Sequence, residues 1–296
     1  MSDRVQSGAH DGAAPPGLAA RHQRVDGLLR LHLHRAEDGG TRVSDLFQRA
    51  PCRVLFPAPE PGDPPLAVLL TTSGGLTGGD RTAVSAVIGP GACATITTSA
   101  AEKIYRALQD EAETQIRVGL QIREQAWGEW LAQETILFDG ARLRRSLRAD
   151  VAPGGRLLAL ESIVLGRTGM GERFDTGLLH DEWEVRREGR LIWIDAMRLE
   201  GEGAARRAAP FGLGMCVAYS TLLYVAGDAA RRIDAVRDTL AKCGDLGGAT
   251  LLDGMLIVRA VAERAHELRA AMTAVACTLR REAGPWPARM PRVWSC

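Results

Sequence analysis

The sequence predicts a mainly β fold, with antiparallel or helical β-sheet layers and two α-helices near the carboxyl terminus. Apolar and polar residues alternate with a period of two in segment after segment from residue 26 onward, as half-buried strands require. The chain also contains 33 glycines and 14 prolines, scattered so that they punctuate many short strands. Because no predicted strand alternates with a long helix before residue 225, a doubly wound α/β sheet is not expected.

The strands are predicted in chain order from this alternation. In the first strand, Leu29, Leu31 and Leu33 share one face. The clearest strand covers residues 114–123, where the apolar side chains occupy every second position. The other strands are expected at residues 53–56, 66–72, 81–88, 92–98, 127–131, 143–151, 156–165, 183–187, 190–199 and 251–258.

Turn residues separate these strands. Residues 89–91 (Gly-Pro-Gly) and 153–155 (Pro-Gly-Gly) each join two predicted strands, and Glu188 with Gly189 indicates a hairpin. Pairing between strands adjacent in sequence builds antiparallel sheets. The turns therefore favour antiparallel pairing.

Helical spacing appears only near the carboxyl terminus. Residues 228–243 and 262–282 carry apolar side chains at intervals of three and four, and the two helices are expected to pack across the β layer. Residues 1–25 are rich in Ala, Gly, Ser and Pro and are expected to form a flexible amino-terminal arm. Residues 26–296 are then one β-rich domain, on which the apolar carboxyl-terminal end docks.

Composition excludes several classes of function. The 37 Lys plus Arg against 36 Asp plus Glu leave a net charge of +1, which removes the main electrostatic attraction to nucleic acid or an anionic membrane. The six cysteines are dispersed without a C-x-x-C pair, which disfavours a structural zinc site. With no secretory signal and no long apolar run, a cytoplasmic protein is expected.

Motifs for catalysis are weak. The chain lacks the lysine-containing loop of P-loop nucleotidases and the G-x-S-x-G turn of serine hydrolases. Its densest glycine cluster, residues 71–80, is interpreted as a tight loop between strands, or as a backbone-lined passage or partner surface at which Asp80 supplies a carboxylate. A competing interpretation is a metal-dependent carboxylate hydrolase with a β-rich fold.

Carboxylates inside apolar strands are the chemistry-bearing residues. Glu134, Glu161 and Asp195 lie in such settings, and an inward carboxylate needs an arginine, a hydrogen-bond network, water or a metal. His32 and His34 share one strand face and could form only a weak transition-metal site, since that face opposes the leucines. Residues 180–182 (His-Asp-Glu) are expected chiefly to form a surface turn.

An ordered set of segments resembles the urease accessory protein UreD (UreH) family. The set spans roughly residues 28–296, and it is far more specific than any one of its members. The matching pieces are Ser73-Gly74-Gly75-Leu76-Thr77-Gly78-Gly79-Asp80, Gly89-Pro90-Gly91, Thr97-Thr98, Glu102-Lys103-Ile104-Tyr105-Arg106, Gln133-Glu134-Thr135-Ile136, Phe138, Glu161, Gly166-Arg167, Gly169, Gly171-Glu172 and Pro291-Arg292-Val293-Trp294.

The resemblance implies a helical-sheet fold and a non-catalytic role in inserting nickel into urease. Its implied partners are UreF, the GTPase UreG through UreF, and apo-urease, with two copies per assembly bridged by UreF. No cofactor is expected to bind tightly, and nickel would pass transiently along spaced carboxylates, which release a divalent ion more readily than a closed cage does. The candidate nickel route comprises Asp80, Glu102, Glu134, Glu161 and Glu172, and the candidate residues of the body or partner surface are Tyr105, Arg106 and Trp294.

Overall fold

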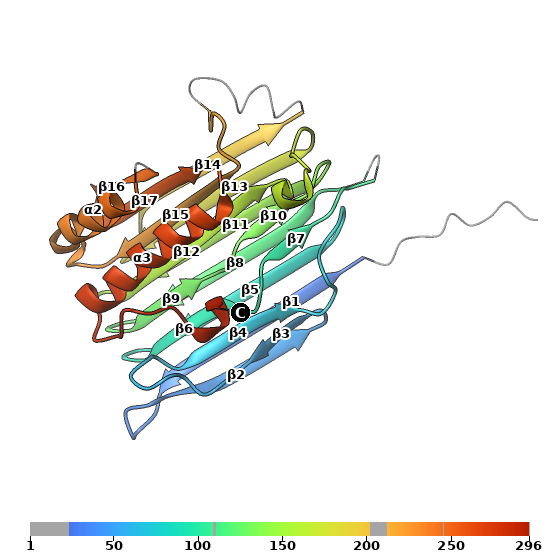
Figure 1. Ribbon diagram of the computed structural model, residues 1–296. Coiled ribbons are helices and arrows are strands. Elements are labelled where there is room, and N and C mark those ends of the chain that lie inside the picture. The colour runs from blue at the N-terminus through green and yellow to red at the C-terminus, as the bar shows by residue number, and fades with distance from the viewer. Residues whose placement is uncertain (1–23, 109–110, 202–211, 245, 296) are drawn as a thin grey trace, which may run out of the picture.

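The computed structural model describes residues 24–108, 111–201, 212–244 and 246–295. Two β-sheets lie face to face, and two helices from the carboxyl-terminal part of the chain lie along the outer face of one of them (Figure 1). This arrangement confirms the predicted fold class. The predicted amino-terminal arm lies outside the described residues, apart from Arg24 and Val25.

One sheet has seven strands, in the order β14-β13-β11-β8-β5-β1-β2. The five inner strands run parallel to one another, and only β2 and β14 pair antiparallel at the two edges. The alternation in the first strand places Leu29, Leu31 and Leu33 in the core, as predicted. The strands are β1 (Asp26–Arg35), β2 (Thr41–Arg49), β5 (Arg81–Ile88), β8 (Thr114–Ile122), β11 (Arg142–Val151), β13 (Leu178–Arg187) and β14 (Arg190–Glu200).

The other sheet has ten strands, with β16-β17-β15-β12-β9-β6-β4-β3 in line; the short β10 pairs with β12, and the short β7 pairs with β10. Strands β4, β6, β9 and β12 run parallel, whereas the pairs at both ends of the sheet are antiparallel. The strands are β3 (Cys52–Leu55), β4 (Leu66–Thr71), β6 (Cys93–Thr98), β7 (Glu102–Ile104), β9 (Trp127–Leu131), β10 (Thr135–Leu137), β12 (Arg156–Leu165), β15 (Ala218–Val225), β16 (Gly247–Leu252) and β17 (Met255–Ala262).

The chain alternates between the two sheets, so the prediction that adjacent strands pair antiparallel is wrong for the central strands. The turn at residues 89–91 leads from β5 in one sheet to β6 in the other, and that at 153–155 leads from β11 to β12. Parallel neighbours need a crossover, and strands of the opposite sheet supply it here. Only the turn at Glu188 and Gly189 makes the expected hairpin, between β13 and β14.

Further strands differ from the sequence expectation, among them the short β7 and β10, which no predicted strand covers. The single strand predicted at 251–258 is a hairpin of β16 and β17, turning at Asp253 and Gly254. The sequence pattern does not predict β2, because nearly all its side chains are exposed, or β15, because all of them are buried. Neither arrangement produces a period-two pattern.

Apolar side chains from both sheets form the inner core, and a second core lies under the helices. In β12, Leu157 and Ala159 face the opposite sheet, while Leu158 and Leu160 face the helices. The predicted helices are confirmed as η2 (Ala229–Arg232) followed by α2 (Ile233–Lys242), and as α3 (Ala265–Ala283). Two further short 3₁₀-helices are η1 (Thr168–Met170) and η3 (Arg292–Ser295).

Candidate functional site

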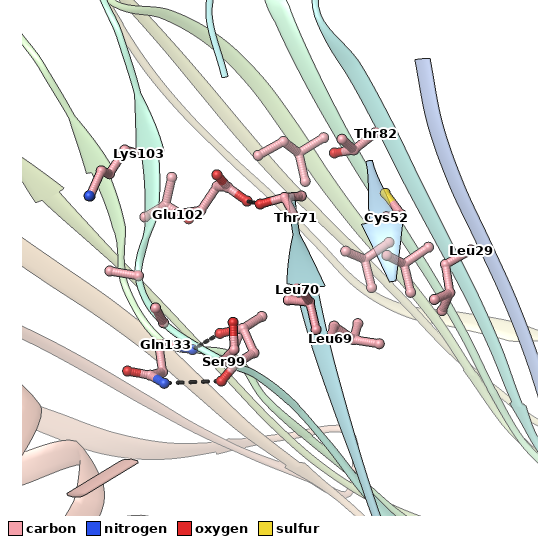
Figure 2. Close-up of a pocket in the computed structure, with 18 of the residues that line it drawn as sticks. Leu29, Cys52, Leu69, Leu70, Thr71, Thr82, Ser99, Glu102, Lys103 and Gln133 are labelled. Carbon is pink, nitrogen blue, oxygen red and sulfur yellow. Dashed lines mark hydrogen bonds between the residues drawn. The ribbon is translucent and has the colours of Figure 1, made fainter. Parts of the chain in front are cut away.

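A cavity of about 250 Å³ lies between the two sheets. Strands β1, β5, β8 and β11 line it from one sheet, and β3, β4, β6, β7, β9, β10 and β12 from the other. Its lining runs from exposed residues such as Gly74, Ala100 and Lys103 to buried ones such as Trp130. Figure 2 shows part of this lining around β4. The winding of the chain between the sheets is what brings these strand ends together.

Glu102 is the first of two acidic residues that line the cavity. It lies in β7, and its side chain turns toward β4, where the Thr71 hydroxyl donates a 2.8 Å hydrogen bond to Oε2 (Figure 2). Burial raises the pKa of the Glu102 carboxyl, and the Thr71 hydrogen bond partly offsets that effect. The carboxylate is therefore poorly solvated, and the Lys103 backbone N–H and charge join the Thr71 hydroxyl in favouring its ionised form.

Glu161 is the second, and it lies deep in β12 with 3% of its surface exposed. The Trp130 indole N–H donates a 3.0 Å hydrogen bond to Oε1. Among the described residues, Oε2 has no hydrogen-bond partner, although the Nε atom of Arg145 lies 3.4 Å away. Burial raises the pKa of Glu161, the nearby Arg145 charge opposes the rise, and the Asp181 carboxylate adds to it.

Arg145 carries a buried positive charge into the same end of the cavity. Its Nε and Nη2 atoms each donate a 2.8 Å hydrogen bond to Asp181, one to each carboxylate oxygen. The Tyr219 hydroxyl donates to Asp181 Oδ2 at 2.7 Å, and burial together with the Asp181 charge raises the pKa of Tyr219. Arg145 and Asp181 thus form a hydrogen-bonded pair beside Glu161.

Sequence reasoning missed Asp181, because the expectation of a surface turn at residues 180–182 is wrong. These residues lie within β13, and Asp181 is 4% exposed. The period-two pattern of β13 could have predicted the burial of Asp181, since Leu179, Trp183 and Val185 lie on the same buried face as Asp181. A carboxylate in that row needs a cationic partner from a neighbouring strand, and Arg145 lies directly opposite in β11.

The other three candidate carboxylates do not line the cavity. Asp80 accepts the backbone N–H groups of Val25 and Thr77, each at 2.8 Å, and so holds the glycine loop in place. Glu134 is paired with an arginine of α3. Glu172 is paired with Arg167, whose hydrogen bond lowers the pKa of the Glu172 carboxyl, with the backbone N–H of Asp139 adding to the effect.

The three candidate surface residues have different environments. Tyr105 is 37% exposed, and its hydroxyl donates a 2.9 Å hydrogen bond to the Gly74 carbonyl at the rim of the cavity. Arg106 is exposed and pairs with Asp139. Trp294 is instead buried, and its indole N–H donates to Thr97 Oγ1 at 2.9 Å. The predicted docking of the carboxyl-terminal end is thus confirmed.

The described residues include no cluster of metal-binding side chains, in the cavity or outside it. Across residues 24–108, 111–201, 212–244 and 246–295, no group of three or more His, Cys, Asp and Glu side chains could hold a metal ion. The five described cysteines are free thiols, and burial raises the pKa of Cys52, in the cavity wall, to about 11. The carboxylates of the cavity could therefore hold a cation only singly and weakly.

A second hollow of about 450 Å³ lies beside the proline-rich segment 57–64 and the carboxyl-terminal end. Its partly buried acid, Asp63, accepts hydrogen bonds from Arg280 at 3.1 Å and Arg289 at 3.0 Å. Because arginines neutralise that acid, the inter-sheet cavity is the better candidate for cation chemistry.

None of the described helices is long and apolar enough to cross a membrane.

Comparison with known proteins points to one family. The family model described as UreD urease accessory protein matches residues 25–295. The chain is 40% identical over 279 residues to the urease accessory protein UreD of Methylobacterium sp. (strain 4-46), covering 93% of this chain and 96% of that protein. It is 41% identical over 280 residues to the UreD of Rhizobium rhizogenes, covering 94% and 97%. It is 38% identical over 277 residues to the UreD of Magnetococcus marinus, covering 92% and 94%.

Proposed function

Because the chain belongs to the UreD family of urease accessory proteins, we propose that it acts as a non-catalytic scaffold in the cytoplasm that assembles on apo-urease. The proposed complex contains UreF, which recruits the GTPase UreG, and two copies of this chain bridged by UreF. The exposed Tyr105 and Arg106 support a partner surface beside the cavity rim, because an aromatic ring and a guanidinium are typical of interface anchors. The nearly neutral net charge agrees with protein partners rather than nucleic acid.

We further propose that the inter-sheet cavity is the route by which nickel reaches urease. The observation that carries this proposal is the pair of acidic side chains, Glu102 and Glu161, in the lining of one cavity. A transfer site must hold Ni²⁺ loosely, and single carboxylates do so better than a cluster of thiolates and imidazoles. The route is narrowed to these two residues, because Asp80, Glu134 and Glu172 lie outside the lining and have other partners.

The test is nickel-dependent activation of apo-urease with purified accessory proteins. We expect Glu161→Gln and Glu102→Gln each to slow activation about tenfold, which corresponds to a loss of about 1.4 kcal/mol of stabilisation of the passing ion. Glutamine keeps the shape and the acceptor oxygen but removes the charge. The matched control is Glu184→Gln, because Glu184 lies outside the cavity lining, where it pairs with Arg148 and Arg186. This variant should activate urease at the wild-type rate.

Assembly must be measured alongside activation. Co-purification of each variant with UreF and apo-urease separates a blocked route from a broken complex. Normal assembly with slow activation supports the route, whereas normal activation by both cavity variants contradicts it. Failure of the wild-type chain to bind UreF or apo-urease would overturn the scaffold proposal itself.

A further inference from the structure

The acid at the inner end of the cavity has an unusual set of neighbours. Glu161 lies 3.4 Å from the guanidinium of Arg145, yet its Oε2 atom makes no hydrogen bond with any described residue. A buried carboxylate beside an arginine normally accepts two parallel hydrogen bonds from it. Here Arg145 donates its two parallel hydrogen bonds to Asp181 instead, each at 2.8 Å.

Asp181 is itself held from the other side. The Tyr219 hydroxyl donates to Oδ2 of Asp181 at 2.7 Å, and Arg145 completes its contacts with a 3.3 Å hydrogen bond from Nη1 to the Thr135 hydroxyl. All four side chains are buried, so water does not weaken these bonds. The guanidinium is therefore fixed with its fork toward Asp181 and only one edge toward Glu161.

We propose that Asp181, supported by Tyr219, is a positioning residue that holds Arg145 on its own carboxylate and so keeps one oxygen of Glu161 open to a divalent cation in the cavity. This inference rests on the nickel route proposed above. Asp181 is absent from the cavity lining and acts through Arg145.

Loss of the Asp181 charge should turn Arg145 toward Glu161. An asparagine offers one acceptor oxygen, and its amide N–H₂ repels the second N–H group of the arginine. Arg145 would then have Glu161 as its nearest carboxylate, and the shortest rearrangement gives it the open Oε2 atom. A carboxylate closed by a guanidinium cannot also bind Ni²⁺.

The test uses the full-length chain in the reconstituted activation reaction with UreF, UreG, apo-urease and Ni²⁺. We expect Asp181→Asn to slow activation about tenfold and to raise the half-saturating Ni²⁺ concentration, with normal assembly. The matched control is Asp228→Asn, because Asp228 also accepts hydrogen bonds from a tyrosine and an arginine, Tyr224 and Arg232, but lies outside the cavity lining. This control should activate at the wild-type rate.

A double variant separates positioning from a merely structural role. In Arg145→Met/Asp181→Asn no arginine is left to close Glu161, so activation should return to within about twofold of wild type. If the double variant is as slow as Asp181→Asn while assembling normally, the positioning role is overturned. Wild-type activation by Asp181→Asn overturns it as well.

The variant Tyr219→Phe tests the positioning role if Asp181→Asn misfolds, and Glu161→Gln distinguishes failure of the positioning role from failure of the nickel route. Should Asp181→Asn not yield folded protein, Tyr219→Phe removes one hydrogen bond to Asp181 and should slow activation by a smaller factor, with Tyr224→Phe as its control. Wild-type activation by Tyr219→Phe would then overturn the inference. Normal activation by Glu161→Gln contradicts the route, whereas slow Glu161→Gln with normal Asp181→Asn contradicts the positioning role alone.

Discussion

Arg269 of α3 donates hydrogen bonds from Nη1 to both carboxylate oxygens of Glu134, at 2.8 and 2.6 Å. The same guanidinium donates from Nη2 to the Trp294 carbonyl at 2.8 Å and lies 4.5 Å above the Trp294 ring. One arginine thus joins the helix, the loop before β10 and the carboxyl-terminal end. The Glu134 carboxylate therefore holds Arg269 in the position from which it binds the carboxyl-terminal segment at Trp294.

Replacing Arg269 by methionine should destabilise the fold by about 1–3 kcal/mol, because the partly buried Glu134 would lose its charged partner. Urea denaturation measures the change. The control is Arg264→Met, whose exposed ion pair with Glu267 at the start of the same helix should contribute less than about 1 kcal/mol. Equal losses for the two variants would contradict the account of Glu134.

Gly75→Ala should be strongly destabilising. Gly75 has φ of 141°, and an added Cβ would lie 2.5 Å from the Tyr105 ring and 3.0 Å from the Lys103 carbonyl. Strain and overlap together predict a loss of about 2–4 kcal/mol in thermal denaturation. Gly74→Ala is the control, since its φ is also positive but the space beside it is open, and it should cost only about 1 kcal/mol.

The Asp139 carboxylate should stabilise the protein in a pH-dependent way. Burial opposes its ionisation, but the backbone N–H groups of Thr176 and Asp175, the Thr176 hydroxyl and the Arg106 charge together hold the pKa of Asp139 below its ordinary value. A lowered pKa in the folded state means that this stabilisation is complete above the unfolded pKa of about 3.9 and disappears as the pH falls through the folded value.

Asp139→Asn should therefore lower the free energy of unfolding by about 1 kcal/mol between pH 5 and 7, and the difference from wild type should shrink below pH 4. Denaturant titrations at several pH values measure it. The neighbouring Asp175→Asn changes an exposed carboxylate and should have little effect. A difference that stays constant down to pH 3 would rule out the ionised form of Asp139 as its source.

The hydrogen bond between Trp294 and Thr97 should appear as coupling in a double-mutant cycle. Trp294→Phe and Thr97→Val each remove one partner of the 2.9 Å bond, and we expect a coupling of about 1 kcal/mol in urea denaturation. Trp286→Phe paired with Thr97→Val is the control, because the buried Trp286 N–H has no hydrogen-bond partner among the described residues. Equal coupling in the two cycles would contradict the assignment.

Local pattern was enough to locate most strands. The predicted bounds agree with β5, β9 and β12, since each buries alternate or continuous apolar side chains, and glycine or proline turns flank β5 and β12. The ordered family motifs also identified the family, which the comparison with known proteins confirms. Both kinds of signal are contained in short stretches of the chain.

Tertiary structure alone decided which sheet each strand joins and which carboxylates are paired. A turn shows where the chain reverses, but consecutive strands here enter opposite sheets, and the pattern of one strand does not name its neighbours. The same holds for charges: Arg145 meets Asp181 from 36 residues away, and Glu134 meets an arginine 135 residues away. The composition alone determines that basic and acidic residues are nearly equal in number. Which of them pair is decided by the packing of strands distant in sequence, and that packing leaves Glu161 with one oxygen that has no hydrogen-bond partner among the described residues.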